Sequence, residues 1–438
     1  MTKGKPLSLL MRFSLPLMLA NVLQFFYIIA DSAVVGRMLG VTAFASIGAS
    51  ATLFWMISSA VISTTHGFGI VFAQRFGAKD MEGLRRAFAT AGFLLAVICV
   101  VIGLIGIFGS RALLVLLNTP AELLDYSTIY LSWLLGGIII TAVFNLLGAA
   151  LRALGDSKTP TKAMIISSVL NIILVFVLVT PLGIAGASIA TLLAQSVGSV
   201  YSFIVLRRTG ALSGNGLHWE TNSAKTLLRL GLPLGFRDTV IAAGGLVVQW
   251  HINSYGVEFV AGVAIARRLY FLLMIGSNGL SAANATFTAQ NFGAGNIERI
   301  RQGVNTGLKL MLTASAVTMA FTFLFGRFIL SLLFEGDPYM VGAVLDVGVW
   351  QLNVMTAGLP LLYLLFLYRT TLEGIGKPLV PALSGFMELI FRLISVLLLS
   401  PFIGRWGIIL SDPAGWLGAA ALLMIAYYSV RKRLRAWA

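Results

Sequence analysis

The stretch Ala73–Arg86, AQRFGAKDMEGLRR, occurs a second time as Ala289–Gln302, AQNFGAGNIERIRQ. Seven of the fourteen positions are identical, and the two copies lie 216 residues apart, close to half of the 438-residue chain. A match of this density at half the chain length predicts an internal duplication.

Two further echoes support this duplication and occur in the same order along the chain. Arg12, Leu15, Pro16 and Leu17 recur 217 residues later as Arg229, Leu232, Pro233 and Leu234, and Leu151, Gly155 and Pro160 recur 221 residues later as Leu372, Gly376 and Pro381. Because the offset hardly changes, the sequence indicates two homologous halves, the second slightly longer than the first.

The composition excludes a water-soluble globule. The chain is 58% hydrophobic and 11% charged, with a mean hydropathy of +0.92. Its apolar runs reach the length of about 20 residues that a helix needs to cross a bilayer. We therefore expect an integral membrane protein, anchored by a retained first helix, because no small-residue cleavage site follows Lys3, Lys5 and Arg12.

Counting these runs gives six spans in each half. The predicted spans are 15–35, 45–73, 87–108, 126–150, 163–180, 184–205, 231–252, 260–287, 308–333, 344–367, 379–402 and 407–428. An even number places both halves in the same orientation, as a parallel repeat. The predicted fold is an all-α membrane protein with a six-helix lobe over 1–206, a connector over 207–229 and a second six-helix lobe over 230–438.

The net charge of +15 follows the pattern of a membrane protein's loops. The even-numbered connections and both tails hold 23 of the 31 basic residues, Arg369 among them, and the opposite side holds six. This asymmetry predicts that both termini are cytoplasmic in a multi-pass protein of the cell's inner membrane, and it accounts for the charge without nucleic acid. Each copy of the repeated stretch then ends a lobe's second helix on the cytoplasmic side, where Gly77 and Gly293 suit a helix C-terminus.

Asp31 is the clearest ionisable residue inside a predicted span of the first half. A carboxylate at bilayer depth costs about 2.5–3.5 kcal/mol on insertion scales. Asn21, Gln24 and Asp31 fall within an arc of about 80° on one helix, so this stripe faces protein or water. The pattern favours a functional carboxylate over an interfacial aspartate that caps the next turn.

Asn171 lies near the middle of the fifth predicted span. It is a natural neutral partner for an acid such as Asp31. Asparagine in a membrane helix also serves as interhelical glue, so both interpretations stay open.

The second half carries its own polar residues at membrane depth. Glu388 and Arg392 are one turn apart and can neutralise each other, either as a structural salt bridge or as a pair facing substrate. Asp238 and Gln249 share one face of the seventh predicted helix.

Chemistry-bearing motifs do not accompany these residues. The three histidines are too scattered for a metal site, Cys99 is the single cysteine, and the common hydrolase and phosphate-binding motifs do not occur. We expect no enzyme activity, catalytic residue, resident metal or cofactor.

The two parallel lobes, the string ADSAVVGRMLG around Asp31, the Leu-Pro near the start of each lobe, the paired AQxFGA ends and RALGDSKTP together resemble the multidrug and toxic compound extrusion (MATE) family. The resemblance spans nearly the whole chain. It implies a V-shaped pair of lobes that alternates between outward and inward openings and exports organic cations in exchange for Na⁺ or H⁺.

The resemblance also implies roles for individual residues. Asp31 matches the family's first-helix aspartate and Asn171 a fifth-helix asparagine, which together would couple the ion. Where some members carry an acid one turn further on, this chain has Val175, and the tenth predicted helix offers Gln351 and Asn353 near its middle, so the coupling ion stays open between Na⁺ and H⁺.

Substrate would lie between the lobes of a monomer. The candidate cavity residues are Gln24, Asp238, Gln249, Glu388 and Arg392. A flippase for lipid-linked or other anionic precursors, from the same superfamily, is the alternative. Such a substrate would need several cavity-facing cations, and the sequence offers a few, namely Arg237, Arg392 and Arg267 or Arg268. A membrane enzyme or a channel fits less well, since neither a polar cluster at one membrane face nor a repeated filter sequence occurs.

Overall fold

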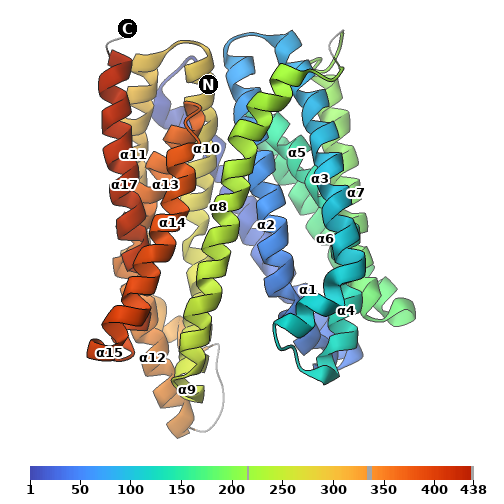
Figure 1. Ribbon diagram of the computed structural model, residues 1–438, viewed down its shortest axis with the longest axis vertical. Helices are drawn as coiled ribbons and strands as arrows, with labels where there is room; N and C mark the ends of the chain where they lie inside the picture. Colours follow the sequence, from blue (N-terminus) through green and yellow to red (C-terminus); the bar gives the residue numbers. More distant parts are fainter. Residues whose placement is uncertain (215–216, 333–337, 436–438) are drawn as a thin grey trace. The chain divides into compact units, whose positions relative to one another are not determined.

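The computed structural model describes residues 1–214, 217–332 and 338–435, with the side chains of 28–32, 338–340 and 433–435 left out of the description. Within these residues every regular element is a helix (Figure 1). The chain divides into two compact units, which we name the N-unit (Leu15–Gly235) and the C-unit (Met1–Ser14 with Phe236–Ala438). We describe each unit by itself.

The N-unit is built from α1 (Pro6–Leu39) without its first turns, six whole helices and the start of α8 (Thr221–Asn253). The six whole helices are α2 (Val41–Gly77), α3 (Met81–Leu116), α4 (Ala121–Gly136), α5 (Ile138–Ala153), α6 (Lys158–Leu182) and α7 (Ile184–Arg208). Helix α2 packs against α4 and α5, and α6 packs against α7.

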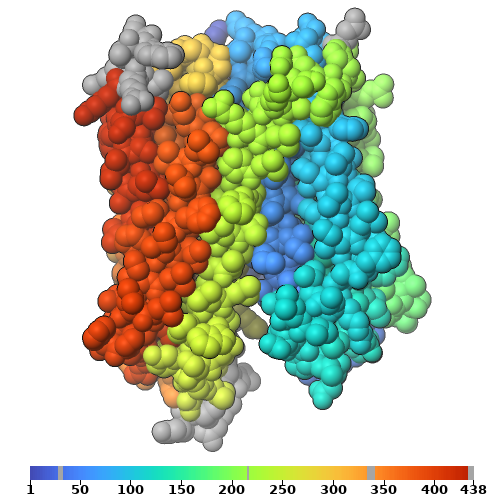
Figure 2. Space-filling view, in the orientation of Figure 1, coloured from blue at the N-terminus to red at the C-terminus, as the bar shows by residue number. Residues whose placement is uncertain are grey.

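The C-unit contains the first turns of α1, the second part of α8 and the remaining helices. The remaining helices are α9 (Val257–Leu273), α10 (Ile275–Gly293), α11 (Ile297–Ser331), α12 (Pro338–Ala357), α13 (Leu359–Gly374), α14 (Leu379–Leu393), the π-helix η1 (Ile394–Leu399), α15 (Ser400–Ile403), α16 (Trp406–Ile409) and α17 (Ser411–Arg435). Figure 2 shows α14 and α17 side by side on one face of this unit. The pairs α9–α12, α10–α13 and α14–α17 repeat the pairs α2–α4, α2–α5 and α6–α7 of the N-unit.

Among the described residues ten helices are long and apolar enough to cross a membrane, and the number is twelve if each of two bent helix pairs is one span. The predicted all-helical membrane fold is confirmed. The bent pairs are α4–α5, with a bend of 46°, and α12–α13, with a bend of 44°.

The two bends occur at glycines that the duplication relates, Gly137 and Gly358. A Cβ atom at Gly137 would lie 2.3 Å from the side chain of Leu192, and one at Gly358 would lie 3.1 Å from Pro413. Leu192 and Pro413 are themselves related by the offset of 221. The same steric requirement therefore recurs at the same place in both units.

Other backbone features repeat in the same way. Gly155 and Gly376 have φ angles of 92° and 76°, and Gly183 and Gly404 both have φ of 59°. These left-handed angles favour glycine, because a Cβ atom would clash with the backbone. The main chain thus follows one plan twice.

The repeated stretch ends a helix in both units, as predicted, since α2 ends at Gly77 and α10 at Gly293. The left-handed residue comes two positions later, at Lys79 (φ 60°) and Gly295 (φ 72°). The sequence placed the glycine correctly at the helix end, but the strained turn itself lies just beyond it.

Asp80 closes this turn in the N-unit and caps α3 by accepting a hydrogen bond of 2.8 Å from the Gly83 N–H. It also forms an ion pair of 2.7 Å with Arg75. Partial burial alone would raise the pKa of Asp80, but the Gly83 N–H and the Arg75 guanidinium outweigh it and lower the pKa below its ordinary value of 3.8.

The apolar core of each unit also carries the duplication. Val175 and Ala187 in one core cluster correspond to Val396 and Ile408 in the other, at an offset of 221. Val175 is fully buried among apolar neighbours. The position for which the resemblance implies an acid in some family members is thus part of the hydrophobic core here.

Two details of the predicted organisation differ from the structure. Helix α7 ends at Arg208 and helix α8 begins at Thr221, so both ends of the predicted connector 207–229 are helical. Arg369, assigned to a cytoplasmic connection, is 5% exposed inside α13, because the helix continues through a polar Thr-Thr pair beyond the predicted span. The lobe boundaries 1–206 and 230–438 stay a prediction.

Candidate functional site

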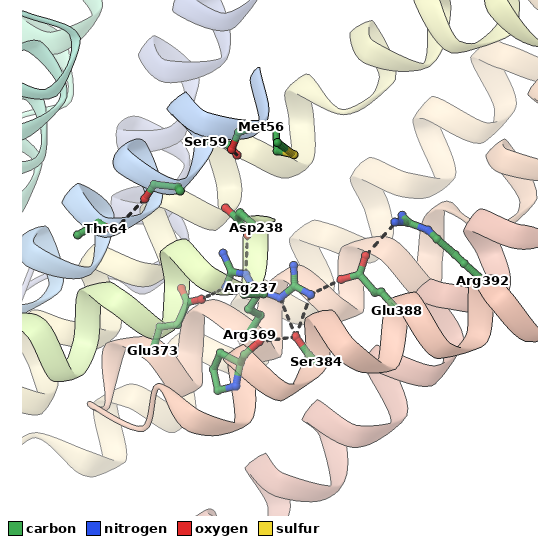
Figure 3. Close-up of polar contacts among 12 residues, drawn as sticks. Met56, Ser59, Thr64, Arg237, Asp238, Arg369, Glu373, Ser384, Glu388 and Arg392 are labelled. Carbon is green, nitrogen blue, oxygen red and sulfur yellow. Dashed lines mark hydrogen bonds and ion pairs between the residues drawn. The ribbon is translucent and has the colours of Figure 1, made fainter. Parts of the chain in front are cut away.

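Ionic side chains gather inside the C-unit, from four helices that are far apart in sequence. We name them the C-unit charge network: Arg237 and Asp238 (α8), Arg369 and Glu373 (α13), Ser384, Glu388 and Arg392 (α14), and Asp412 (α17). Figure 3 shows all of them but Asp412, with one group of contacts around Arg237 and a second that runs from Arg369 to Arg392.

Arg237 binds two carboxylates at once. Its Nε donates to Asp238 Oδ1 at 2.7 Å, and its Nη1 donates to Glu373 Oε1 at 2.5 Å. Arg237 is 8% exposed and Glu373 is 6% exposed. A single guanidinium, with its fixed fork of donors, thus ties α8 to α13.

Arg369, four residues before Glu373 on α13, makes the second group of contacts, from α13 to α14. Its Nε and Nη2 donate to Ser384 Oγ at 3.2 and 2.9 Å, and Nη2 also donates to Glu388 Oε1. Ser384 in turn donates to the Pro381 carbonyl at 2.7 Å. Because Ser384 and Glu388 are four residues apart, they lie on one face of α14 and receive the same arginine.

Arg392 forms the last link, from α14 to α17. Its Nη2 lies 3.6 Å from Glu388 Oε2, and its Nε lies 3.1 Å from Asp412 Oδ1. The predicted pairing of Glu388 with Arg392 is therefore present, but each residue has a nearer partner. The pair is one link of a longer network instead of an isolated salt bridge.

Small residues make room for the long arginine side chains. A Cβ atom at Gly385 would lie 2.6 Å from Arg237 Cγ, and one at Gly415 would lie 3.2 Å from Arg392 Cγ. The glycines let α8 and α17 approach α14 closely enough for the ionic groups to meet.

The network holds three guanidinium groups and four carboxylates, so one carboxylate is in excess. Removing one partner of a buried ion pair typically costs about 3–5 kcal/mol. The arrangement is thus an expensive one for a membrane interior, where charged residues usually mark a path for ions or substrate.

Asp238 is the most accessible of the four acids. Its side chain is 26% exposed, against 8% for Glu373, 5% for Glu388 and 15% for Asp412. The excess negative charge is therefore most easily reached at Asp238.

The structure brings together three of the predicted site residues, namely Asp238, Glu388 and Arg392. Gln249 lies elsewhere on α8, where its Oε1 accepts from Arg267 at 3.0 Å and its Nε2 donates to Asn253 at 2.9 Å. Gln24 is half-buried on α1 in the N-unit. Asp31 belongs to α1, but its side chain lies outside the described residues.

Asn171 is 2% exposed in α6, and its Nδ2 donates to Thr191 Oγ1 at 3.1 Å. The offset of 221 relates Asn171 and Thr191 to Arg392 and Asp412. The same two positions thus hold a neutral pair in the N-unit and an ion pair in the C-unit. Asn171 Oδ1 has no hydrogen-bond partner among the described residues.

Sequence reasoning missed Arg369, Glu373 and Asp412. The signal for the first two was the i,i+4 spacing of opposite charges directly after a predicted span, which allows that span to be one turn longer. Asp412 could have been found from the duplication, as the counterpart of Thr191 opposite Asn171.

Comparison with known proteins identifies the family. The sequence profile of the MatE family matches residues 16–177 and again 233–398. The chain belongs to the MATE family. The two matched segments coincide with the two halves of the duplication, and the family is one of membrane transporters, not enzymes.

Individual relatives agree with this assignment. "Probable multidrug resistance protein YpnP" of Bacillus subtilis is 29% identical over 342 residues, which are 77% of this chain and 76% of that protein. "Probable multidrug resistance protein NorM" of Thermotoga maritima is 25% identical over 392 residues, 87% of this chain and 82% of that protein.

A solved structure shows the same fold. The MOP superfamily transporter from Pyrococcus furiosus, described as having a binding pocket of reverse polarity, superposes with a TM-score of 0.92 at 21% identity, covering 99% of this chain and 98% of that one. The chain is thus a multi-pass membrane transporter with the MATE fold.

Proposed function

We propose that the protein is a multidrug efflux antiporter that exports organic cations in exchange for Na⁺ or H⁺. Both termini would be cytoplasmic, in the inner membrane, and the lobes 1–206 and 230–438 would alternate access as a monomer. The relatives named as multidrug resistance proteins support the substrate class.

The observation that carries the proposal is the excess carboxylate of the C-unit charge network. A cation that binds at Asp238 supplies the missing positive charge and competes with Arg237 for that carboxylate. Because Arg237 and Asp238 both belong to α8, releasing Arg237 from Asp238 frees that guanidinium to rearrange while its contact with Glu373 on α13 keeps it paired. Binding therefore changes the relative energy of two arrangements, which is what a cation-driven conformational cycle needs.

In the N-unit the proposal assigns ion coupling to Asp31 with Asn171. Asn171 Oδ1, which has no hydrogen-bond partner among the described residues, is an acceptor that suits a hydrated proton or a cation. Gln24, on the same stripe of α1 as Asp31, would face the substrate together with Gln249, Glu388 and Arg392.

Export of an anionic or lipid-linked precursor is the alternative. The pocket of reverse polarity described for the Pyrococcus furiosus transporter keeps it in view. Against it, Arg237, Arg369 and Arg392 each already contact at least one carboxylate in this structure, so an anion would have to displace an acid.

The test is transport of a fluorescent organic cation by proteoliposomes under Na⁺ and pH gradients imposed separately. We expect one gradient to drive accumulation, and Asp238→Asn to reduce it by about tenfold, as loss of one charge contact implies. Glu298→Gln, which removes an exposed acid paired with Arg301, serves as the matched control and should leave transport unchanged. Uptake that ignores both gradients, or that selects an anionic dye, would reject the proposal.

A further inference from the structure

A second site lies in the C-unit, away from the charge network. A cavity of about 290 Å³ opens among Tyr255, Glu258, Phe259, Asp346, Trp350 and Arg405, with Ala343 and Val347 completing its wall. Tyr255 precedes α9, Glu258 and Phe259 lie at the start of α9, Asp346 and Trp350 lie on α12, and Arg405 lies in the turn between α15 and α16. Figure 1 shows α9, α12 and α15 at one end of the unit. We name this cavity the Trp350 pocket.

The Trp350 ring already receives a flat cation. The Arg405 guanidinium carbon lies 4.5 Å from the ring centroid, and Trp406 covers Trp350 with its centroid 5.6 Å away. Tyr255 and Phe259 add a second aromatic pair, with centroids 5.3 Å apart. Such faces attract planar, weakly hydrated cations through their quadrupole.

The carboxylates of the pocket have different partners. Asp346 lies 3.5 Å from the Arg327 guanidinium. Glu258 is exposed and makes no ion pair among the residues that the structure describes. Glu258 is therefore the acid available to a ligand.

Comparison of the two halves shows which residues of the Trp350 pocket are shared with the N-unit and which occur in the C-unit alone. The Arg327–Asp346 pair has its counterpart in Arg111–Asp125 of the N-unit, where the two groups are 2.6 Å apart. The other polar and aromatic residues of the pocket have no such counterparts: Tyr255, Glu258, Phe259, Trp350 and Arg405 correspond to Leu39, Thr42, Ala43, Ile129 and Ile184. Only the ion pair is common to both halves, so the aromatic and ionic lining is specific to the C-unit.

We propose that the Trp350 pocket binds a planar aromatic cation. The ligand stacks on Trp350 in place of the Arg405 guanidinium, and Glu258 neutralises its charge. Arg405 acts as an internal competitor that occupies the ring face while the pocket is empty of ligand. This site does not depend on the transport function proposed above.

Because Arg405 competes with the ligand for the Trp350 ring, removing Arg405 should raise the affinity for the ligand. N-methylacridinium, a planar cation, is titrated into the purified full-length protein, and its fluorescence quenching by tryptophan reports binding. Arg405→Ala should tighten binding by about threefold to tenfold, because a competing cation–π contact is removed. A gain in affinity does not arise from a misfolded variant.

Two further variants and one control complete the design. Trp350→Leu and Glu258→Gln should each weaken binding by about tenfold, since one removes the ring face and the other the counter-charge. Arg111→Ala removes an arginine from the N-unit, with the same change in net charge, and should leave the affinity unchanged. Neutral acridine at pH 8 should not respond to Glu258→Gln.

Unchanged or weaker binding in Arg405→Ala would overturn the proposal. The proposal would also be overturned if a phospholipid co-purified with the wild type but not with Arg405→Ala, and if N-methylacridinium did not displace that phospholipid. Transport measured in the same variants separates the two proposals. If Arg405→Ala shows gradient-driven uptake but an unchanged affinity for the dye, the ligand site at the Trp350 pocket is rejected and the antiporter proposal is not affected.

Discussion

Glu388 is the residue whose replacement tests the charge network most directly. It is 4% exposed and contacts two arginines, Arg369 by a hydrogen bond and Arg392 across 3.6 Å. The change Glu388→Gln keeps the shape of the side chain and removes its charge. Among the described residues Arg369 would then keep the Ser384 hydroxyl but have no carboxylate within ion-pair distance, whereas Arg392 would keep Asp412 at 3.1 Å.

The expected loss of stability follows from these contacts. Leaving Arg369 buried without a carboxylate contact should cost about 3–5 kcal/mol in the free energy of unfolding. The cost should fall when Arg369 is replaced at the same time by Met, which fills a similar volume without charge. We expect a coupling free energy of about 2–3 kcal/mol for Glu388 with Arg369.

Arg392 should be coupled to Glu388 less strongly. Its nearer acid is Asp412, so the cycle of Glu388→Gln with Arg392→Met should give about 1 kcal/mol or less. The ranking of the two cycles is the prediction, because it depends on geometry and not on the absolute scale of buried charges.

The assay is reversible chemical unfolding of the detergent-solubilised protein, followed by near-ultraviolet circular dichroism, for the wild type, three single variants and two double variants. Gradient-driven uptake is measured on the same preparations, so that a folded but inactive variant is recognised. Equal coupling in both cycles, or a larger value for Arg392, would refute the network as described.

Three further predictions concern other parts of the chain. Asp31→Asn should insert and fold normally but lose gradient-driven efflux, as measured with inside-out vesicles, and wild-type uptake under both gradients would make Asp31 structural. Asp80→Ala should destabilise the protein by about 1 kcal/mol at pH 7. Because the folded-state pKa of Asp80 is lowered, its contribution is present above the unfolded value of 3.8 and is lost as the pH falls through the folded value, so melting curves of wild type and variant should converge only below about pH 4. In a background without Cys99, an impermeant thiol reagent added to whole cells should label Ser254→Cys and spare Ser213→Cys; the opposite pattern would invert the proposed topology.

Much of the fold could be predicted from the sequence because hydrophobic length and internal repetition are both read directly from residue order. The helix ends at Gly77 and Gly293 were found in this way. The bends at Gly137 and Gly358 were not, because a glycine inside an apolar run looks like any small residue until the neighbour that excludes a Cβ atom is known.

The candidate site could be predicted only in part. Glu388 and Arg392 were found because their spacing places them on one helix face. Arg369 and Glu373 were assigned to a loop, since their charges end a hydropathy window although α13 continues through them. A window that averages hydropathy cannot distinguish a polar loop from a helical turn whose charges are neutralised by another helix.

Gly183 and Gly404 share one backbone conformation, yet the helices that follow them differ in chemistry, with Thr191 in one unit and Asp412 in the other. The turns between helices have thus been conserved since the duplication, whereas the side chains of the helices have diverged. Each half can therefore serve as a reference for the other half. The Asn171–Thr191 pair shows a neutral hydrogen bond at the positions where the C-unit has the Arg392–Asp412 ion pair. Exchanging the residues at equivalent positions of the two halves would test the role of a charge, with the unchanged half of the same chain as the control.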